Sequence, residues 1–185
     1  MKTGIPGMLG AILLILTLCL PASASESGTI TITMTGVETT ISISLDKSNW
    51  ALGEVTEDTE YKTDPEATWC TITNEGNVDV DLGVKGEHAV YASLMWALSA
   101  DGTNDGVGSY PEYALWYHVA MDTEGSYTLI TLDSSPMQDA DGTTLSLDPE
   151  KTKQFGLKSL TPEFFPPEYL DKEMTTHITI SAVKA

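Results

Sequence analysis

The sequence predicts an all-β protein, an antiparallel β-sandwich of the immunoglobulin-like or jelly-roll kind with roughly nine or ten strands. First, apolar and polar residues alternate along many segments, which is typical of strands buried on one face. Second, turns rich in Gly, Asn, Asp and Pro separate these segments at short intervals. Third, no window shows a sustained helical period, so the sequence predicts no helical layer.

The alternation is clearest in three segments, TITITMT (29–35), TTISISLD (39–46) and NVDVDLGVK (77–85). Weaker strands are predicted over residues 67–73, 93–99, 113–121, 127–132, 143–147, 154–158 and 177–183. The turn from Asn74 to Asn77 is predicted to close a hairpin. Residues 161–174 carry three prolines, so we expect an irregular loop with at most a short helical turn there.

The first 24 residues have the three parts of a secretory signal peptide. Lys2 supplies the basic start, residues 9–20 form an apolar run, and Ala22-Ser23-Ala24 is a small-residue cleavage site after Pro21. The alternative is a buried or membrane helix. We expect cleavage after Ala24, a single domain over residues 25–185, no membrane span after cleavage, and a secreted protein associated with the cell envelope.

The charge balance is strongly acidic, with 27 Asp and Glu, nine Lys, no Arg and a formal net charge of −18. Such a surface repels phosphate backbones and anionic lipid headgroups, so nucleic-acid binding is not expected. After cleavage Cys70 is the single cysteine, which excludes an intramolecular disulfide. We expect Cys70 to be a small buried apolar residue; an intermolecular bridge is the alternative.

Residues 101–112, DGTNDGVGSYPE, match the calcium-loop template of EF-hands at most fixed positions. The oxygen ligands that the template predicts are Asp101, Thr103, Asp105, the Val107 carbonyl, Ser109 and Glu112. Thr103 stands where the template has a carboxylate or amide, and predicted strands rather than helices flank the loop. An ordinary turn loop is therefore the alternative. Residues 139–144 match the same template less well.

Aromatic residues cluster in GSYPEYALWYH, residues 108–118. Alternation places Tyr113 and Tyr117 on one face of the strand and Trp116 on the other. If the first face is the core, Trp116 and Tyr110 would form an exposed platform for a carbohydrate or other ligand. The alternative is that both faces are covered by packing.

No catalytic motif is recognisable. The sequence lacks a serine-nucleophile signature, a C-x-x-C pair and a nucleotide-binding glycine loop, and His88, His118 and His177 are not spaced as metal ligands. Paired carboxylates for glycoside hydrolysis stay open, because 27 acids offer many pairs. We therefore expect a protein that is not an enzyme, with a two-carboxylate hydrolase as the lowest-ranked alternative.

The segment SNWALGEV…ATWCTITNEGNVDVDLGVKG, over Asn49 to Gly86, resembles immunoglobulin-like modules of secreted bacterial and archaeal surface proteins. Filament subunits of the TasA/camelysin kind, including archaeal bundling pilins, have a similar layout of signal peptide and single β-sandwich. The resemblance implies a domain that assembles at the cell surface by strand donation between subunits.

The start of the mature chain suits that expectation, since TITITMT is short, uncharged and β-prone, and such a strand can complete a neighbouring sheet. The alternative is that it pairs within its own domain. The sequence thus predicts a structural or adhesive surface protein that binds itself or other envelope proteins. A carbohydrate- or ligand-binding module, stabilised by Ca²⁺, is the alternative.

Overall fold

The computed structural model describes residues 35–36, 38–63, 68–106, 110–120, 127–139 and 141–185. The chain divides into two units, Met1–Gly36 and Val37–Ala185. The predicted signal peptide and most of the predicted strand 29–35 lie outside the described residues. Every strand described below belongs to the second unit.

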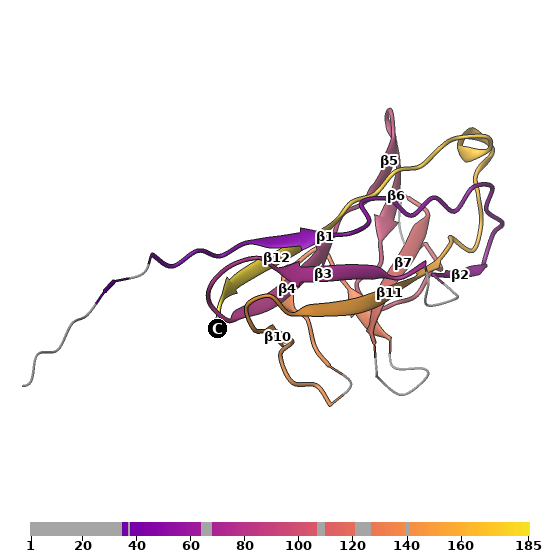
Figure 1. Cartoon of the computed structure of the whole chain (residues 1–185). Helices are drawn as coiled ribbons and strands as arrows, with labels where there is room; N and C mark the ends of the chain where they lie inside the picture. Colours follow the sequence, from indigo (N-terminus) through magenta and orange to yellow (C-terminus); the bar gives the residue numbers. More distant parts are fainter. Residues whose placement is uncertain (1–34, 37, 64–67, 107–109, 121–126, 140) are drawn as a thin grey trace, which may run out of the picture. The chain divides into compact units, whose positions relative to one another are not determined.

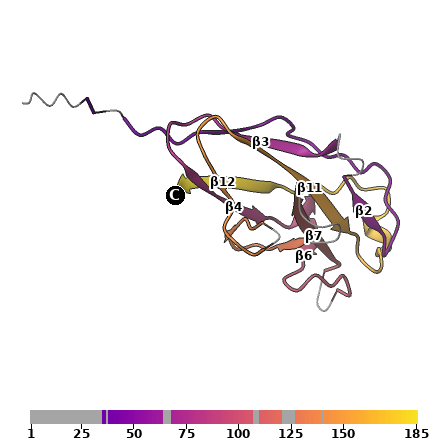
Figure 2. The same ribbon diagram turned by 60° about the horizontal axis from the view of Figure 1, so that its bottom comes forward.

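The described part of the second unit is all-β, as the sequence predicts, and its two sheets lie in separate layers (Figures 1 and 2). The larger sheet has eight strands: β1 (Ile43–Leu45), β2 (Glu60–Lys62), β3 (Cys70–Asn74), β5 (Ala89–Tyr91), β6 (Leu94–Leu98), β7 (Glu112–Val119), β8 (Thr128–Ile130) and β11 (Thr152–Leu160). The smaller sheet has four: β4 (Val80–Gly86), β9 (Ser135–Pro136), β10 (Ser146–Leu147) and β12 (Ile178–Lys184).

Strand order in the larger sheet is β1-β3-β11-β7-β6-β5, with β2 also paired to β11 and β8 to β7. In the smaller sheet the order is β10-β4-β12, and β9 also pairs with β4. The pairs are antiparallel with one exception, since β6 and β7 pair in parallel where Ala97 faces Glu112. The predicted β-sandwich is therefore confirmed, with this one short parallel pair added to it.

Most predicted strands are present, but several are shorter than predicted. Residues 39–46 form only the three-residue β1, and residues 143–147 form only β10. The sequence did not predict β2, β5 or β9, which have two or three residues each. A segment that short contains too few residues for a period of two to be recognised.

The prediction of a hairpin at Asn74 to Asn77 is wrong, because β3 belongs to the larger sheet and β4 to the smaller one. The turn is a corner that carries the chain between the layers. Asn74 is fully buried there, and its side-chain Nδ2 donates to the carbonyls of Val78 and Leu147 at 2.9 and 2.8 Å. These bonds connect the corner to both neighbouring segments, which local turn chemistry cannot reveal.

The core lies between the sheets. It is formed by alternate residues of the long strands, which are Ile72, Val80, Leu82, Val84, Leu115, Tyr117, Val119 and Phe155, closed by Ile130, Met137, Leu145 and Leu147. Between β11 and β12 the chain forms a loop with a short 3-10 helix at Pro167–Tyr169, as expected of a proline-rich segment. Phe165 of this loop stacks on Trp96, with ring centroids 5.2 Å apart.

Candidate functional site

The predicted calcium loop joins β6 to β7, and its described part is a tight polar turn. Asp101 Oδ1 accepts hydrogen bonds from the backbone N–H of Thr103 at 3.0 Å and from its hydroxyl at 2.8 Å. The same hydroxyl lies 3.3 Å from Asp105 Oδ1, so the two carboxylates share one neighbour. Two other predicted ligands, Val107 and Ser109, lie outside the described residues.

A second turn in the molecule has the same tripeptide and the same geometry. Asp141 Oδ1 accepts from the Thr143 backbone N–H at 3.0 Å and from its hydroxyl at 2.6 Å. The glycine between the two residues has a positive φ in each turn, +85° at Gly102 and +81° at Gly142. In both turns these hydrogen bonds hold the pKa of the aspartate below its ordinary value. Asp-Gly-Thr is therefore a recurring turn of this chain.

The fit of this loop to Ca²⁺ is partial. Calcium takes six to eight oxygens, and the described part of the loop brings together two carboxylates and one hydroxyl. Glu112, the predicted bidentate ligand, begins β7 and is half-buried. Within the described ranges, no three His, Cys, Asp or Glu side chains are gathered closely enough to hold a metal ion. The remaining predicted oxygens are those of Val107, Ser109 and Glu112.

The structure brings the loop and the predicted ligand-binding tryptophan together. A Cβ on Gly102 would lie 3.1 Å from Trp116 Cζ2, so the loop backbone packs directly against the indole. Trp116 is half-buried on the outer face of β7, as alternation predicts, whereas Tyr110 is 46% exposed. Both faces of β7 are largely covered, because Ala114 and His118 are buried beside the core residues.

Trp116 belongs to a group that we call the lysine–aromatic cluster, which consists of Trp116, Tyr127, Lys158, Lys62 and Glu60. Lys158 Nζ lies 4.2 Å from the Trp116 ring centroid and 4.8 Å from that of Tyr127. Glu60 pairs with Lys62 at 2.7 Å and with Lys158 at 3.3 Å, and these lysines, Lys62 first, hold its pKa below the ordinary value. A sugar stacking on Trp116 would therefore have to displace Lys158 or the loop.

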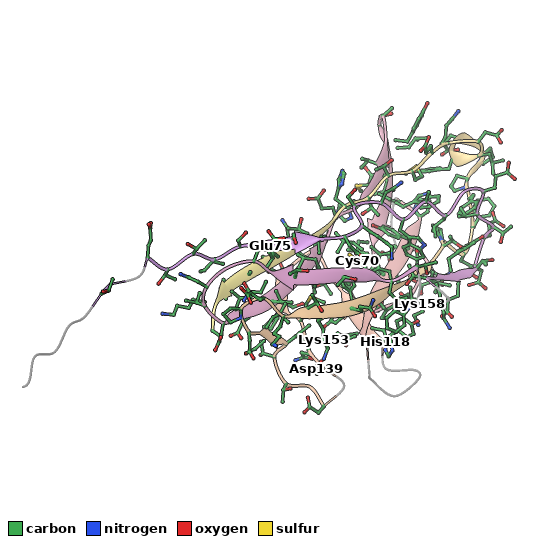
Figure 3. The ribbon with its side chains drawn as sticks, in the orientation of Figure 1. Cys70, Glu75, His118, Asp139, Lys153 and Lys158 are labelled. Carbon is green, nitrogen blue, oxygen red and sulfur yellow. The ribbon has the colours of Figure 1, made fainter. Side chains whose placement is uncertain are left out.

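The cluster continues to the buried ring of His118 and the half-buried ring of Trp69. Figure 3 labels His118 of β7 and Lys158 of β11 close to each other. His118 packs edge-on against Trp69 at 5.3 Å and lies 5.2 Å from Tyr127. No sequence signal predicted this arrangement, because its members come from β2, β7, β11 and the segments flanking β3 and β8.

Two further reactive side chains, Cys70 and His88, are held by hydrogen bonds within the fold. Cys70 is half-buried and free, and burial raises the pKa of its thiol. A raised pKa lowers the thiolate fraction, so the residue is a poor nucleophile. His88 accepts a hydrogen bond at Nδ1 from the Leu98 amide at 2.9 Å.

A shallow hollow of about 270 Å³ lies on the outer face of the smaller sheet, away from every predicted site residue. Its lining includes Gly83, where a Cβ would lie 2.8 Å from Ser181 Oγ. Its rim includes Pro136 and Val183. Hydroxyls, short apolar side chains and one carboxylate, Asp81, line it, with no aromatic ring and no catalytic pair.

The edge of the smaller sheet is a further candidate site. In the described part of the chain β12 has one strand partner, β4, over seven consecutive residue pairs. The inward side chains of β12, which are Ile178, Ile180 and Ala182, pack against the core but are only half-buried. Among the described strands, β12 therefore has one edge without a partner, beside an incompletely covered part of the core.

No protein-family model matches the chain, and no curated protein matches it at a significant level. The resemblance to immunoglobulin-like surface modules stays a prediction. Within the described residues, no helix is long and apolar enough to cross a bilayer.

Proposed function

We propose that this protein is a secreted, non-catalytic structural or adhesive component of the cell envelope that assembles by strand donation. The observation that carries the proposal is the edge of β12 that no described strand covers. Exposed strand edges are templates for strand addition, and natural proteins normally protect them with charges, prolines or bulges. The seven residues of β12, ITISAVK, include no proline, and Lys184 at the end of the strand is their single charged residue.

The donor in this proposal is residues 29–35 of a second copy. TITITMT has seven residues, the length of β12, and carries no charge. Its apolar positions Ile30, Ile32 and Met34 alternate as the inward positions of β12 do. A strand added there would gain backbone hydrogen bonds and extend the apolar cover over the half-buried side chains of β12.

The test compares two single substitutions in the chain beginning at Ser25, which contains the whole second unit. Ile32→Asp places a charge on the apolar face of the donor, and Thr31→Asp places the same charge on its polar face. Sedimentation over a hundredfold range of concentration should show association for the unsubstituted chain and Thr31→Asp, and a monomer for Ile32→Asp. A chain that is monomeric throughout, or equal effects of the two changes, would contradict strand donation.

A ligand-binding module stabilised by Ca²⁺ is the second candidate. The contact of Gly102 with Trp116 favours it, because metal binding in the loop would then stiffen the surroundings of an aromatic residue. The ligand would be a glycan that contacts Trp116 and Tyr110. This candidate needs Val107, Ser109 and Glu112 to complete the oxygen set.

Chelated protein should be melted with and without millimolar Ca²⁺, beside Asp101→Ala and Asp141→Ala. A metal bound only by the folded state raises stability by mass action. The two aspartates make the same turn, so Asp141→Ala controls for loss of the turn itself. A calcium-dependent rise that Asp101→Ala alone loses would support the site; no rise in the unsubstituted chain would exclude it.

A further inference from the structure

The proline-rich loop between β11 and β12, residues 161–174, exposes two large apolar side chains. Phe164 is 62% exposed, the highest value among the large apolar residues that the structure describes, and Leu170 is 52% exposed. In sequence they lie on either side of the 3-10 helix Pro167–Tyr169. Exposed apolar side chains that polar residues surround are typical of interaction sites.

Hydrogen bonds fix the backbone on both sides of Phe164. Before it, the Glu163 amide donates to the Asn104 carbonyl at 3.1 Å. After it, the Phe165 amide donates to Glu57 Oε1 at 2.7 Å, while the Phe165 ring packs against the core. The exposure of Phe164 is therefore set by an ordered backbone, and a partner would not have to order this segment on binding.

The other end of the loop is anchored in the same way. Tyr169 is only 7% exposed, and its hydroxyl donates to the Met95 carbonyl at 3.3 Å. Leu170 follows it directly. Each of the two exposed apolar residues is thus the sequence neighbour of an aromatic residue that packs inward and fixes its position.

Exposed carboxylates flank these two apolar residues. The segment before β2 lies beside the loop, because the Asp58 amide donates to the Pro162 carbonyl at 2.9 Å (Figure 1). The exposed acids of the two segments are Glu57, Asp58, Glu163, Glu168, Asp171 and Glu173. Together with Phe164 and Leu170 they form what we call the acidic–apolar surface.

The charge of this surface is not neutralised by nearby lysines. Among the described residues, none of its six carboxylates forms an ion pair. Lys172 is the single basic residue of the loop, and its Nζ lies 5.8 Å from the ring centroid of Tyr91 in β5. The surface therefore combines fixed apolar side chains with uncompensated negative charge.

The chemistry of the surface favours one kind of occupant. In the parts of the chain that the structure describes, no three acidic, histidine or cysteine side chains are close enough together to hold a metal ion. A second copy has a formal net charge of −18 and would be repelled. Nucleic acids and anionic lipids are repelled for the same reason. A polypeptide segment with lysines or arginines between apolar residues matches both the charge and the apolar groups.

We propose that the acidic–apolar surface binds a basic segment of a different protein, one that carries apolar residues between its cationic side chains. Phe164 supplies the main apolar contact, because exposed aromatic residues on an ordered backbone typically contribute most to such interfaces. The carboxylates select a cationic partner and accelerate its association. The inference does not depend on strand donation, since the surface includes no residue of the donor segment or of β12.

The test measures peptide binding by fluorescence anisotropy on the chain beginning at Ser25. The probes are three labelled peptides of equal length, which alternate Lys with Leu, Lys with Ser, and Glu with Leu. Phe164→Ala removes the apolar contact. Leu132→Ala is its matched control, because Leu132 is 46% exposed and is followed by the exposed Asp133 in the loop after β8.

A second pair of variants tests the charge. Glu163→Gln/Glu168→Gln removes two negative charges from the surface, and Asp133→Asn/Asp148→Asn removes two exposed charges elsewhere. Both members of the pair have the same net charge, so a difference between them reports the location of binding. Melting temperatures verify that every variant is folded.

The Lys–Leu peptide should bind the unsubstituted chain more tightly than the Lys–Ser peptide, and the Glu–Leu peptide should not bind. Phe164→Ala should weaken binding by about tenfold, as expected for an aromatic contact. Glu163→Gln/Glu168→Gln should weaken it and reduce its dependence on salt. Leu132→Ala should leave binding unchanged, and Asp133→Asn/Asp148→Asn should weaken it less than the surface pair does.

No binding of the Lys–Leu peptide, or equal effects of Phe164→Ala and Leu132→Ala, would overturn the proposal. Loss of self-association in Phe164→Ala would also overturn it, because the occupant would then be a second copy. Displacement of the peptide by Ca²⁺ at an ionic strength where NaCl has no effect would assign the carboxylates to a metal instead. None of these outcomes bears on the comparison of Ile32→Asp with Thr31→Asp that tests strand donation.

Discussion

β4 and β12 lie side by side in one sheet, have seven residues each and alternate in the same way, yet only β4 buries its inner face. Val80, Leu82 and Val84 of β4 are 0–1% exposed, whereas Ile178 and Ile180 of β12 are half-buried. β4 has strand partners on both sides, β12 on one side and β9 and β10 on the other. β12 has β4 alone among the described strands.

The comparison shows that alternation decides which face of a strand turns inward, while the number of neighbours decides how completely that face is buried. A central strand and an edge strand can therefore carry similar sequences. It also locates the part of the core that an added strand would cover. Three substitutions in the two strands test this difference, and a change of pH that acts elsewhere in the fold follows them, in order of decreasing expected effect.

Leu82→Ala in β4 should lower the free energy of unfolding by about 3 kcal/mol, because it leaves a cavity in a fully enclosed part of the core. Urea unfolding of dilute protein measures this loss. An effect below about 1 kcal/mol would show that β4 is far less tightly packed than its burial indicates.

Ile180→Ala in β12 should cost only about 1.5 kcal/mol in dilute protein, since the side chain is half-buried and its site can relax. If an added strand covers β12, the cost should increase in the associated state. Urea unfolding at low and high protein concentration compares the two. Equal losses of stability for Leu82→Ala and Ile180→Ala in dilute protein would contradict the expected difference in packing between β4 and β12.

Gly83→Ala tests the contact between the outer faces of the two strands. The new Cβ would lie 2.8 Å from Ser181 Oγ, which should cost about 1 kcal/mol through local strain. Thermal unfolding measures the cost. The double variant Gly83→Ala/Ser181→Ala should recover most of it, because the obstructing hydroxyl is absent; no recovery would place the strain elsewhere.

Lowering the pH should reduce the stability of the fold least, through carboxylates that lie outside both strands. Backbone donation from Thr71 holds the pKa of Asp46 below its ordinary value of 3.8, and Lys62 holds that of Glu60 below 4.5. Their folded pKa values lie below the unfolded ones, so the stability that they contribute is present above about pH 4.5 and is lost as pH falls through the folded values.

Melting temperatures between pH 5 and pH 3 measure this loss, and Asp46→Asn should flatten the profile. Asp46 follows β1 and Glu60 begins β2, so β4 and β12 are not directly involved. A profile that Asp46→Asn leaves unchanged would assign the acid sensitivity to other carboxylates.

In the predicted sites too, neighbouring residues determine some features, while others depend on residues that are distant in the sequence. The sequence located the polar turn at Asp101, because Asp-Gly-Thr adopts its geometry through bonds within three residues, and it does so again at Asp141. It also placed Trp116 on the outer face of its strand. It could not show that Lys158, 42 positions further along the chain, covers the indole.

The sequence by itself determined the fold class and the inward face of each long strand, because both depend on a period of two that residues a few positions apart establish. Only the tertiary structure decided that the corner after β3 joins two sheets, that β6 pairs with β7 in parallel, and that β12 lies at an edge. The physical reason is that strand partners are selected by packing between segments distant in sequence. Burial and open edges follow from those partners.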